Sequence, residues 1–147
     1  MTDVLIIGCG VIGAACAYEL AHSRVSVTVL EASNDVANGT TKANSAILHA
    51  GYDPHPGTQM AALNVEGVRL ARELCRRLDV PYDPIGSLVL AFDEADLATL
   101  HTLYERGVKN GVPGLQLLDA AAVHAMEPNL ADQVRGALYA PSAAVVN

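Results

Sequence analysis

The chain has 147 residues, of which 51% are hydrophobic, and its formal net charge is −7. This length suffices for a domain with a buried core, and the acidic balance disfavours nucleic acid as a partner because no basic stripe is present to neutralise phosphates. No apolar run approaches the roughly 18 residues of a membrane-spanning helix, and Met1 leads almost directly into a strand pattern. We therefore expect a cytoplasmic protein without a leader peptide, and peripheral contact with the inner face of the membrane stays open.

The first 31 residues follow the pattern of a strand, a glycine turn, a helix and a second strand. Residues 4–7 form an apolar, β-rich run that leads into a G-x-G-x-x-G motif made by Gly8, Gly10 and Gly13. The first glycine permits a tight turn, the second lets the backbone approach a pyrophosphate, and the third lets the following helix pack closely on the strand. Glu31 follows 18 residues after Gly13. This combination predicts dinucleotide binding, with a turn that serves packing alone as the alternative.

The elements on either side of the turn indicate which dinucleotide is bound. A helical pattern covers residues 11–22, with an apolar stripe for packing on a sheet, and a strand pattern covers residues 25–30. The N-terminus of this helix offers free N–H groups and a positive dipole end to phosphates. Glu31, at the tip of the second strand, is placed to accept hydrogen bonds from both hydroxyls of an adenosine ribose. An acidic residue there disfavours a 2′-phosphate, so FAD or NAD is favoured over NADP.

A polar segment between residues 32 and 56 is rich in Asn, Gly, Thr and Ser and shows no sustained period. A segment of this length without elements of its own is uncommon in a compact domain and is usually functional. Two interpretations stay open. Residues 42–48 form a short helix whose N-terminus, with Thr40 and Thr41, faces the same phosphates, or the whole segment is a polar surface loop.

The later part of the chain alternates between helix and strand patterns. Residues 58–78 predict a helix whose apolar face consists of Met60, Leu63, Gly67, Ala71, Leu74, Cys75 and Leu78. A strand over 85–92 follows, and Asp93 is the expected N-cap of a helix over 94–110 that Gly111 ends. A strand over 115–118, a short helix capped by Asp119 and ended by Glu127-Pro128, and a last strand over 135–140 complete the pattern.

The glycine motif, Glu31 and residues 38–52 (N-G-T-T-K-A-N-S-A-I-L-H-A-G-Y) resemble the N-terminal part of the FAD-dependent oxidoreductases of the D-amino-acid oxidase superfamily. Within it they are most similar to bacterial glycerol-3-phosphate dehydrogenases of the anaerobic-subunit type. Residues 86–92, 104–114 and 127–130 extend the resemblance over nearly the whole chain. L-2-hydroxyglutarate dehydrogenases share an Asn-Ser and His-x-Gly segment in the same place.

The resemblance implies FAD as the cofactor and assigns residues to it. The ADP half of FAD is bound by Gly8, Gly10, Gly13 and Glu31. The pyrophosphate, the ribityl chain or the flavin edge is lined by Thr40, Thr41, Asn44 and Ser45. His49 lies near the isoalloxazine, either as a proton-transfer group or as a hydrogen-bonded wall residue.

The expected fold is α/β: a Rossmann-like FAD-binding βαβ unit followed by part of an α+β substrate domain. The resemblance implies a boundary near residue 80, with residues 1–80 in the FAD-binding domain and 81–147 in a partial substrate domain. A doubly wound sheet needs at least a third parallel strand, so we expect an N-terminal fragment of a longer enzyme. Its exposed sheet edges favour self-association into a homo-oligomer.

The function implied by the resemblance is FAD-dependent oxidation of sn-glycerol 3-phosphate, a small-molecule substrate, to dihydroxyacetone phosphate. Electrons would pass on to a quinone or an electron-accepting subunit. One alternative is an FAD-dependent L-2-hydroxyglutarate or amino-acid oxidase or dehydrogenase, and another is an isolated nucleotide-binding or assembly module. An NAD-dependent dehydrogenase is disfavoured because a simple NAD fold does not need the polar segment. The three cysteines and five histidines show no metal-binding spacing, so no metal site is expected.

Overall fold

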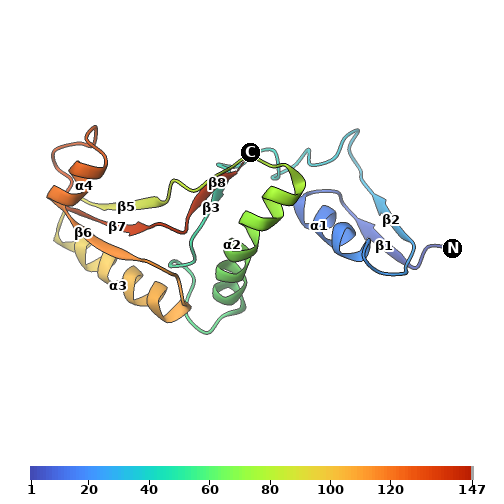
Figure 1. Cartoon of the computed structure of the whole chain (residues 1–147), viewed down its shortest axis with the longest axis horizontal. Coiled ribbons are helices and arrows are strands. Elements are labelled where there is room, and N and C mark those ends of the chain that lie inside the picture. The colour runs from blue at the N-terminus through green and yellow to red at the C-terminus, as the bar shows by residue number, and fades with distance from the viewer. Residues whose placement is uncertain (147) are drawn as a thin grey trace. The chain divides into compact units, whose positions relative to one another are not determined.

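The structure, a computed structural model, describes residues 1–146, and its contacts divide the chain into two compact units (Figure 1). The first unit is Met1–Ser45 and the second begins at Ala46. One two-stranded sheet belongs to the first unit and two three-stranded sheets belong to the second. The boundary near residue 80 concerns cofactor and substrate roles rather than contacts, and it stays a prediction.

The first unit is the predicted βαβ arrangement, with β1 (Val4–Ile7), α1 (Val11–Leu20) and β2 (Val27–Leu30). The strands β1 and β2 pair in parallel, in a register that runs from Val4 opposite Val27 to Ile7 opposite Leu30. The strand β2 begins two residues later than predicted because Ser26 bonds to a side chain: its N–H donates to Asp3 Oδ2 over 2.8 Å. This unit confirms the α/β fold class and the crossover helix.

The face of α1 that packs on the sheet differs from the predicted apolar stripe, which shares with it Leu20 but not the exposed residues Val11, Ile12, Ala15 and Cys16. Val11 and Ile12 are 59% and 76% exposed, whereas Gly13, Ala17 and Leu20 are half-buried. Gly13 and Ala17 have little or no side chain, so α1 approaches β1 most closely along their face. The helix therefore packs through its small residues, and its large apolar side chains at 11 and 12 lie at the surface.

The polar segment after β2 forms turns, so of the two interpretations left open the polar loop is confirmed and the short helix over residues 42–48 is wrong. The N–H of Lys42 donates to Gly39 O over 3.1 Å, and the side-chain amide of Asn44 donates to the carbonyls of Thr40 and Thr41 over 3.0 and 2.9 Å. In a helix those two carbonyls would accept from backbone N–H groups four residues on. Here the Asn44 side chain donates to both carbonyls, and the Ala43 N–H, only three residues on, also donates to Thr40 O over 3.1 Å. The segment is therefore a polar loop, and it leads into the short strand β3 (Ile47–Leu48).

The second unit contains two antiparallel sheets (Figure 1). In one, β8 (Ala144–Val146) lies between β3 and β4 (Tyr82–Asp83). In the other, β7 (Gly136–Ala140) lies between β5 (Ser87–Ala91) and β6 (Gln116–Asp119). The second sheet follows the predicted strands, whereas β3, β4 and β8 were not predicted, because two or three residues are too few to show a period.

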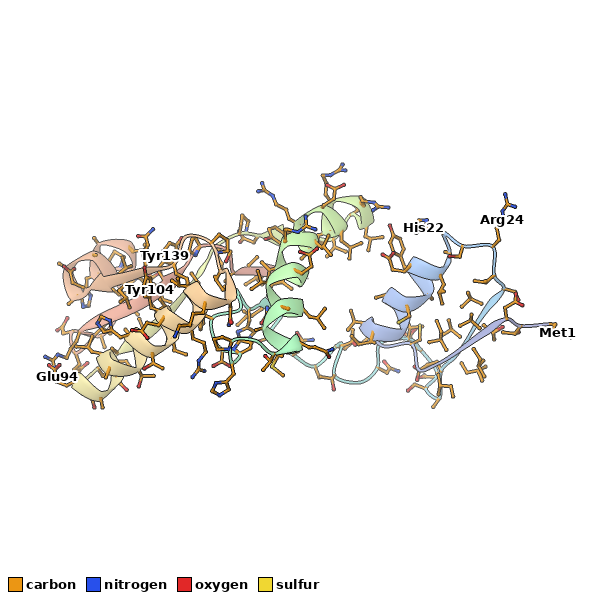
Figure 2. The ribbon with its side chains drawn as sticks, turned by 90° about the horizontal axis from the view of Figure 1, so that it is seen from below. Met1, His22, Arg24, Glu94, Tyr104 and Tyr139 are labelled. Atoms are coloured by element: carbon orange, nitrogen blue, oxygen red, sulfur yellow. The ribbon has the colours of Figure 1, made fainter. Side chains whose placement is uncertain are left out.

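Three helices complete the second unit: α2 (Gln59–Leu78), α3 (Glu94–Asn110) and α4 (Ala120–Met126). The caps of α3 and α4 are those predicted: Asp93 accepts from Asp96 N–H and Asp119 from Ala122 N–H, each over 2.8 Å, and Gly111 ends α3 with φ +81°. Tyr104 of α3 packs against a core cluster of Ala91, Leu100 and Leu138 (Figure 2). No helix among residues 1–146 is long and apolar enough to cross a membrane.

The buried face of α2 differs from the predicted one in the first half of the helix, whereas Ala71, Leu74 and Cys75 of the predicted face are half-buried in its second half. Met60 and Leu63 are each 69% exposed, whereas Ala61 is buried and Val65 packs against a core cluster that includes Ala50 and Val112. The helix carries apolar residues on two faces, and periodicity alone does not decide which of them a neighbouring element covers. Here the face with Ala61 and Val65 packs within the unit.

The cap of α3 provides a test of the second unit's stability. Replacing Asp93 with Ala is expected to destabilise the protein by about 0.5–2 kcal/mol, because the Asp96 N–H loses its acceptor. Thermal unfolding of the D93A variant measures this loss. The matched control is D132A, since Asp132 is an exposed carboxylate without a hydrogen bond among residues 1–146. Equal midpoints for the two variants would contradict the assignment of the cap.

Candidate cofactor-binding site

The glycine turn between β1 and α1 has the geometry that its three glycines require. Gly8 has φ +94°, a conformation that glycine adopts without strain, and its N–H donates to Leu30 O over 2.7 Å. A Cβ on Gly13 would overlap the carbonyl oxygen of Gly8 and lie 3.1 Å from its carbonyl carbon. A Cβ on Gly10 would lie 3.2 Å from Thr41 Oγ1. The turn is therefore closed by direct backbone packing that side chains would block.

The N-terminus of α1 offers unused hydrogen-bond donors. Gly10 is the N-cap and supplies no side-chain acceptor, and within residues 1–146 the N–H groups of Gly10, Ile12 and Gly13 have no acceptor. Thr41 lies at the same end of the helix, where its Oγ1 accepts from Val11 N–H over 3.0 Å. Its hydroxyl proton stays free to donate. Free N–H groups, a donor hydroxyl and the positive helix end together fit a phosphate group.

Glu31 connects the end of β2 to the glycine turn. One carboxylate oxygen accepts from Cys9 N–H over 2.7 Å and the other from Ser33 N–H over 2.9 Å. These hydrogen bonds, that from Cys9 first, lower the pKa of Glu31 below its ordinary value. The group is therefore a carboxylate at neutral pH, and its negative charge beside the turn suits hydroxyl donors and repels a further phosphate.

The acid sensitivity of this contact can be measured. Because the pKa of Glu31 is lower in the folded protein, its stabilising effect is fully present above the unfolded value of 4.5 and is lost as pH falls through the folded value. We expect E31Q to unfold at a lower temperature than wild type at neutral pH, with the difference closing below pH 4.5. The control E19Q, at an exposed carboxylate on α1, should follow wild type throughout. A difference in unfolding temperature between E31Q and wild type that stays constant with pH would contradict this role.

The loop over residues 35–44 is folded against the glycine turn and fixed by its own polar groups. Ala37 N–H donates to Cys9 O over 3.0 Å, and Lys42 Nζ donates to Asp35 Oδ2 over 3.1 Å. Thr41 thereby reaches the turn. The Asn44 side-chain amide donates to the Thr40 carbonyl within the loop, and Ser45, which directly follows the loop, is exposed. No sequence pattern marks the contact of Ala37 with Cys9, because both partners are backbone groups.

The second unit carries His49, which directly follows β3. Its side chain is exposed, and its backbone carbonyl accepts from Asn64 Nδ2 over 2.6 Å. The structure thus brings Gly8, Gly10, Gly13, Glu31 and Thr41 together in the first unit and places His49 in the other. Among residues 1–146, no group of three or more His, Cys, Asp or Glu residues is arranged to hold a metal ion.

Comparison with known families decides the class of protein. A family model for FAD-dependent oxidoreductases matches residues 3–147. The chain belongs to the FAD-dependent oxidoreductase family. This membership confirms the resemblance drawn from the glycine motif and the polar segment.

Relatives of this FAD-dependent oxidoreductase include enzymes with different substrates. The chain is 51% identical to a glycerol 3-phosphate dehydrogenase of Caloramator mitchellensis, over 99% of the chain and 30% of the relative. It is 36% identical to the mitochondrial L-2-hydroxyglutarate dehydrogenase of Homo sapiens, over 86% of the chain and 28% of the relative. A solved structure of dithionite-reduced L-α-glycerophosphate oxidase from Mycoplasma pneumoniae with FAD bound matches 99% of the chain at a TM-score of 0.91 and 32% identity. The chain covers 38% of that structure, so it spans about a third of the length of these relatives.

Proposed function

We propose that the whole protein is an FAD-dependent dehydrogenase that oxidises sn-glycerol 3-phosphate to dihydroxyacetone phosphate. The observation that carries the cofactor assignment is the N-terminus of α1, where free N–H groups, the Thr41 hydroxyl and the closed glycine turn fit a pyrophosphate. The substrate assignment is supported by the 51% identity to a glycerol 3-phosphate dehydrogenase.

In this proposal the first unit binds the ADP half of FAD. The N–H groups of the first turn of α1 donate to the pyrophosphate, and the Thr41 hydroxyl donates its free proton while accepting from Val11. The Glu31 carboxylate accepts from the ribose hydroxyls. It can still accept from Cys9 N–H, because each carboxylate oxygen has two lone pairs. Thr40, Asn44 and Ser45 line the pyrophosphate, the ribityl chain or the flavin edge.

The chemistry requires a hydride acceptor and a proton acceptor. FAD, when bound, supplies the acceptor for the hydride that leaves the secondary alcohol carbon. His49 receives the hydroxyl proton, because imidazole is the side chain best suited to proton transfer near neutral pH. Its exposed side chain, on a segment with an anchored backbone, is available for a substrate.

The partners follow from the same proposal. Electrons pass from the reduced enzyme to a quinone or to an electron-accepting subunit. Residues 1–80 then belong to the FAD-binding domain, with His49 near the isoalloxazine, and residues 81–147 to a partial substrate domain. The strands β3 and β4 of one sheet, and β5 and β6 of the other, have a free edge among the described residues, which supports strand pairing with other parts of the protein or with a second copy.

The second candidate function is oxidation of L-2-hydroxyglutarate, and the 36% identity to the human enzyme supports it. Anaerobic rapid mixing of the purified whole protein with each substrate separates the two proposals. We expect glycerol 3-phosphate to reduce the flavin at least about ten times faster than L-2-hydroxyglutarate does. A tenfold ratio corresponds to a difference of roughly 1.4 kcal/mol in activation free energy. Reduction by L-2-hydroxyglutarate alone would replace the first proposal by the second.

A further inference from the structure

Residues 49–54, here called the His49 segment, are fixed by side chains rather than by secondary structure. They form no helix or strand, yet four of their six carbonyls accept hydrogen bonds from side chains of α2 and α3. These bonds run from Asn64 to His49 O (2.6 Å), from Arg106 to Asp53 O (2.7 Å), and from Asn110 to Gly51 O and Pro54 O (2.9 and 2.8 Å). The backbone that carries His49 is therefore held by the two long helices.

Asn110, the last residue of α3, bridges the His49 segment. Its half-buried amide donates one hydrogen to Gly51 O and the other to Pro54 O, across sequence separations of 59 and 56 residues. Two carbonyl partners fix the orientation of the amide, because a carbonyl oxygen can only accept and the Nδ2 group, not Oδ1, must therefore face it. The Asn110 Oδ1 atom is buried and has no partner among the described residues. Both donors of the amide are therefore directed at the segment.

Packing beneath the segment leaves little room for it to shift. Gly51 is buried with φ +106°, and a Cβ on it would lie 2.8 Å from Val65 Cγ2 of α2. Gly107, one turn before Asn110, faces the segment as well, since a Cβ there would lie 2.8 Å from Tyr52 Cβ. Close contact with both helices limits how far the segment can move, and the two Asn110 hydrogen bonds then set where its carbonyls lie within that space.

We propose that Asn110 is a positioning residue for His49, fixing the segment from which the imidazole reaches the substrate. This inference rests on the proposed function, in which His49 accepts the substrate proton. Asn64 donates to the carbonyl of His49 itself, and Asn110 donates to the carbonyls of Gly51 and Pro54. Loss of the Asn110 amide releases the two carbonyls that keep the chain after His49 on α3.

The test compares flavin reduction in the whole FAD-loaded protein, using wild type, N110A, N110D, H49A and the double variant H49A/N110A. N110D keeps the volume of the side chain but places a carboxylate against two carbonyls. We expect N110A and N110D to slow flavin reduction at saturating substrate about 10- to 100-fold, with substrate affinity nearly unchanged. T102A is the matched control, because the Thr102 hydroxyl bonds only to Ala98 O within α3. In the H49A background, N110A should have no further effect on the rate.

Two readouts decide the outcome. Hydrogen exchange of a peptide covering residues 49–54 should rise in N110A and stay unchanged in T102A. Unchanged exchange in N110A, or an equal rate loss from N110A with and without His49, would overturn the inference. If H49A is slow while N110A is as fast as wild type, the inference alone fails. If H49A is itself as fast as wild type, the role of His49 in the proposed function fails together with it.

Discussion

The G13A variant is expected to lose FAD and to unfold the glycine turn. A Cβ at this position would overlap the Gly8 carbonyl oxygen and lie 3.3 Å from Ile6 Cγ2, so α1 could accept it only by moving away from β1. Overpacking a well-fitted site typically costs about 1–3 kcal/mol, and a clash with backbone falls at the upper end because no rotamer relieves it. The same displacement removes the first turn of α1 from the pyrophosphate.

The molar ratio of FAD to protein after purification measures this effect, with thermal unfolding as a second readout. We expect G13A to contain less than about a tenth of the wild-type FAD. A loss of about 1.4 kcal/mol in binding free energy weakens the affinity for FAD tenfold, and bound FAD falls in proportion when the cofactor is limiting. G39A is the matched control: a Cβ on Gly39, in the same unit, meets nothing within 4 Å and its φ is not positive. Full FAD content in G13A would show that the turn does not hold the cofactor.

The H49A variant is expected to bind FAD normally and to reduce it slowly. Removal of a general base typically lowers the rate by about 10²- to 10⁴-fold, since the substrate hydroxyl proton then has no positioned acceptor. Anaerobic stopped-flow mixing with glycerol 3-phosphate gives the rate of flavin reduction directly. The wall-residue interpretation of His49 predicts a much smaller loss.

The control for this prediction is H55A, which removes another exposed imidazole of the same unit six residues along the chain. The carbonyl of His55 accepts from Thr58, but no hydrogen bond of its ring occurs among residues 1–146. We expect H55A to reduce flavin at the wild-type rate. Equal rates for H49A, H55A and wild type would exclude His49 as the proton acceptor.

Elements with strong local signals could be predicted from the sequence. The helix α3 begins after Asp93 and ends before Gly111, as the cap residues indicated, because each cap depends on only a few neighbouring residues. The βαβ unit was equally accessible, since its glycine spacing, strand pattern and acidic residue all point to the same arrangement. Family membership then confirmed FAD as the cofactor, whereas the roles of the individual motif residues stay predictions.

Features that depend on distant residues or on competing local bonds could not be predicted. Thr41 reaches Val11 across 30 positions, and Asn110 reaches Gly51 across 59, so neither contact leaves a periodic trace. The sequence left helix and loop open for residues 42–48, and the Asn44 amide favours the loop because it donates to the Thr40 and Thr41 carbonyls that a helix would pair with backbone N–H groups. For α1, close packing at Gly13 decided which face meets the sheet.

We propose that this chain supplies the ADP-binding part of an FAD site in a glycerol 3-phosphate dehydrogenase. An absorbance spectrum of the purified whole protein, recorded before and after anaerobic addition of glycerol 3-phosphate, tests it most directly. The account predicts flavin bands that bleach on addition while dihydroxyacetone phosphate forms in an amount equal to the flavin reduced. Flavin bands that persist would contradict the substrate, and a spectrum without flavin bands would contradict the cofactor and the function built on it.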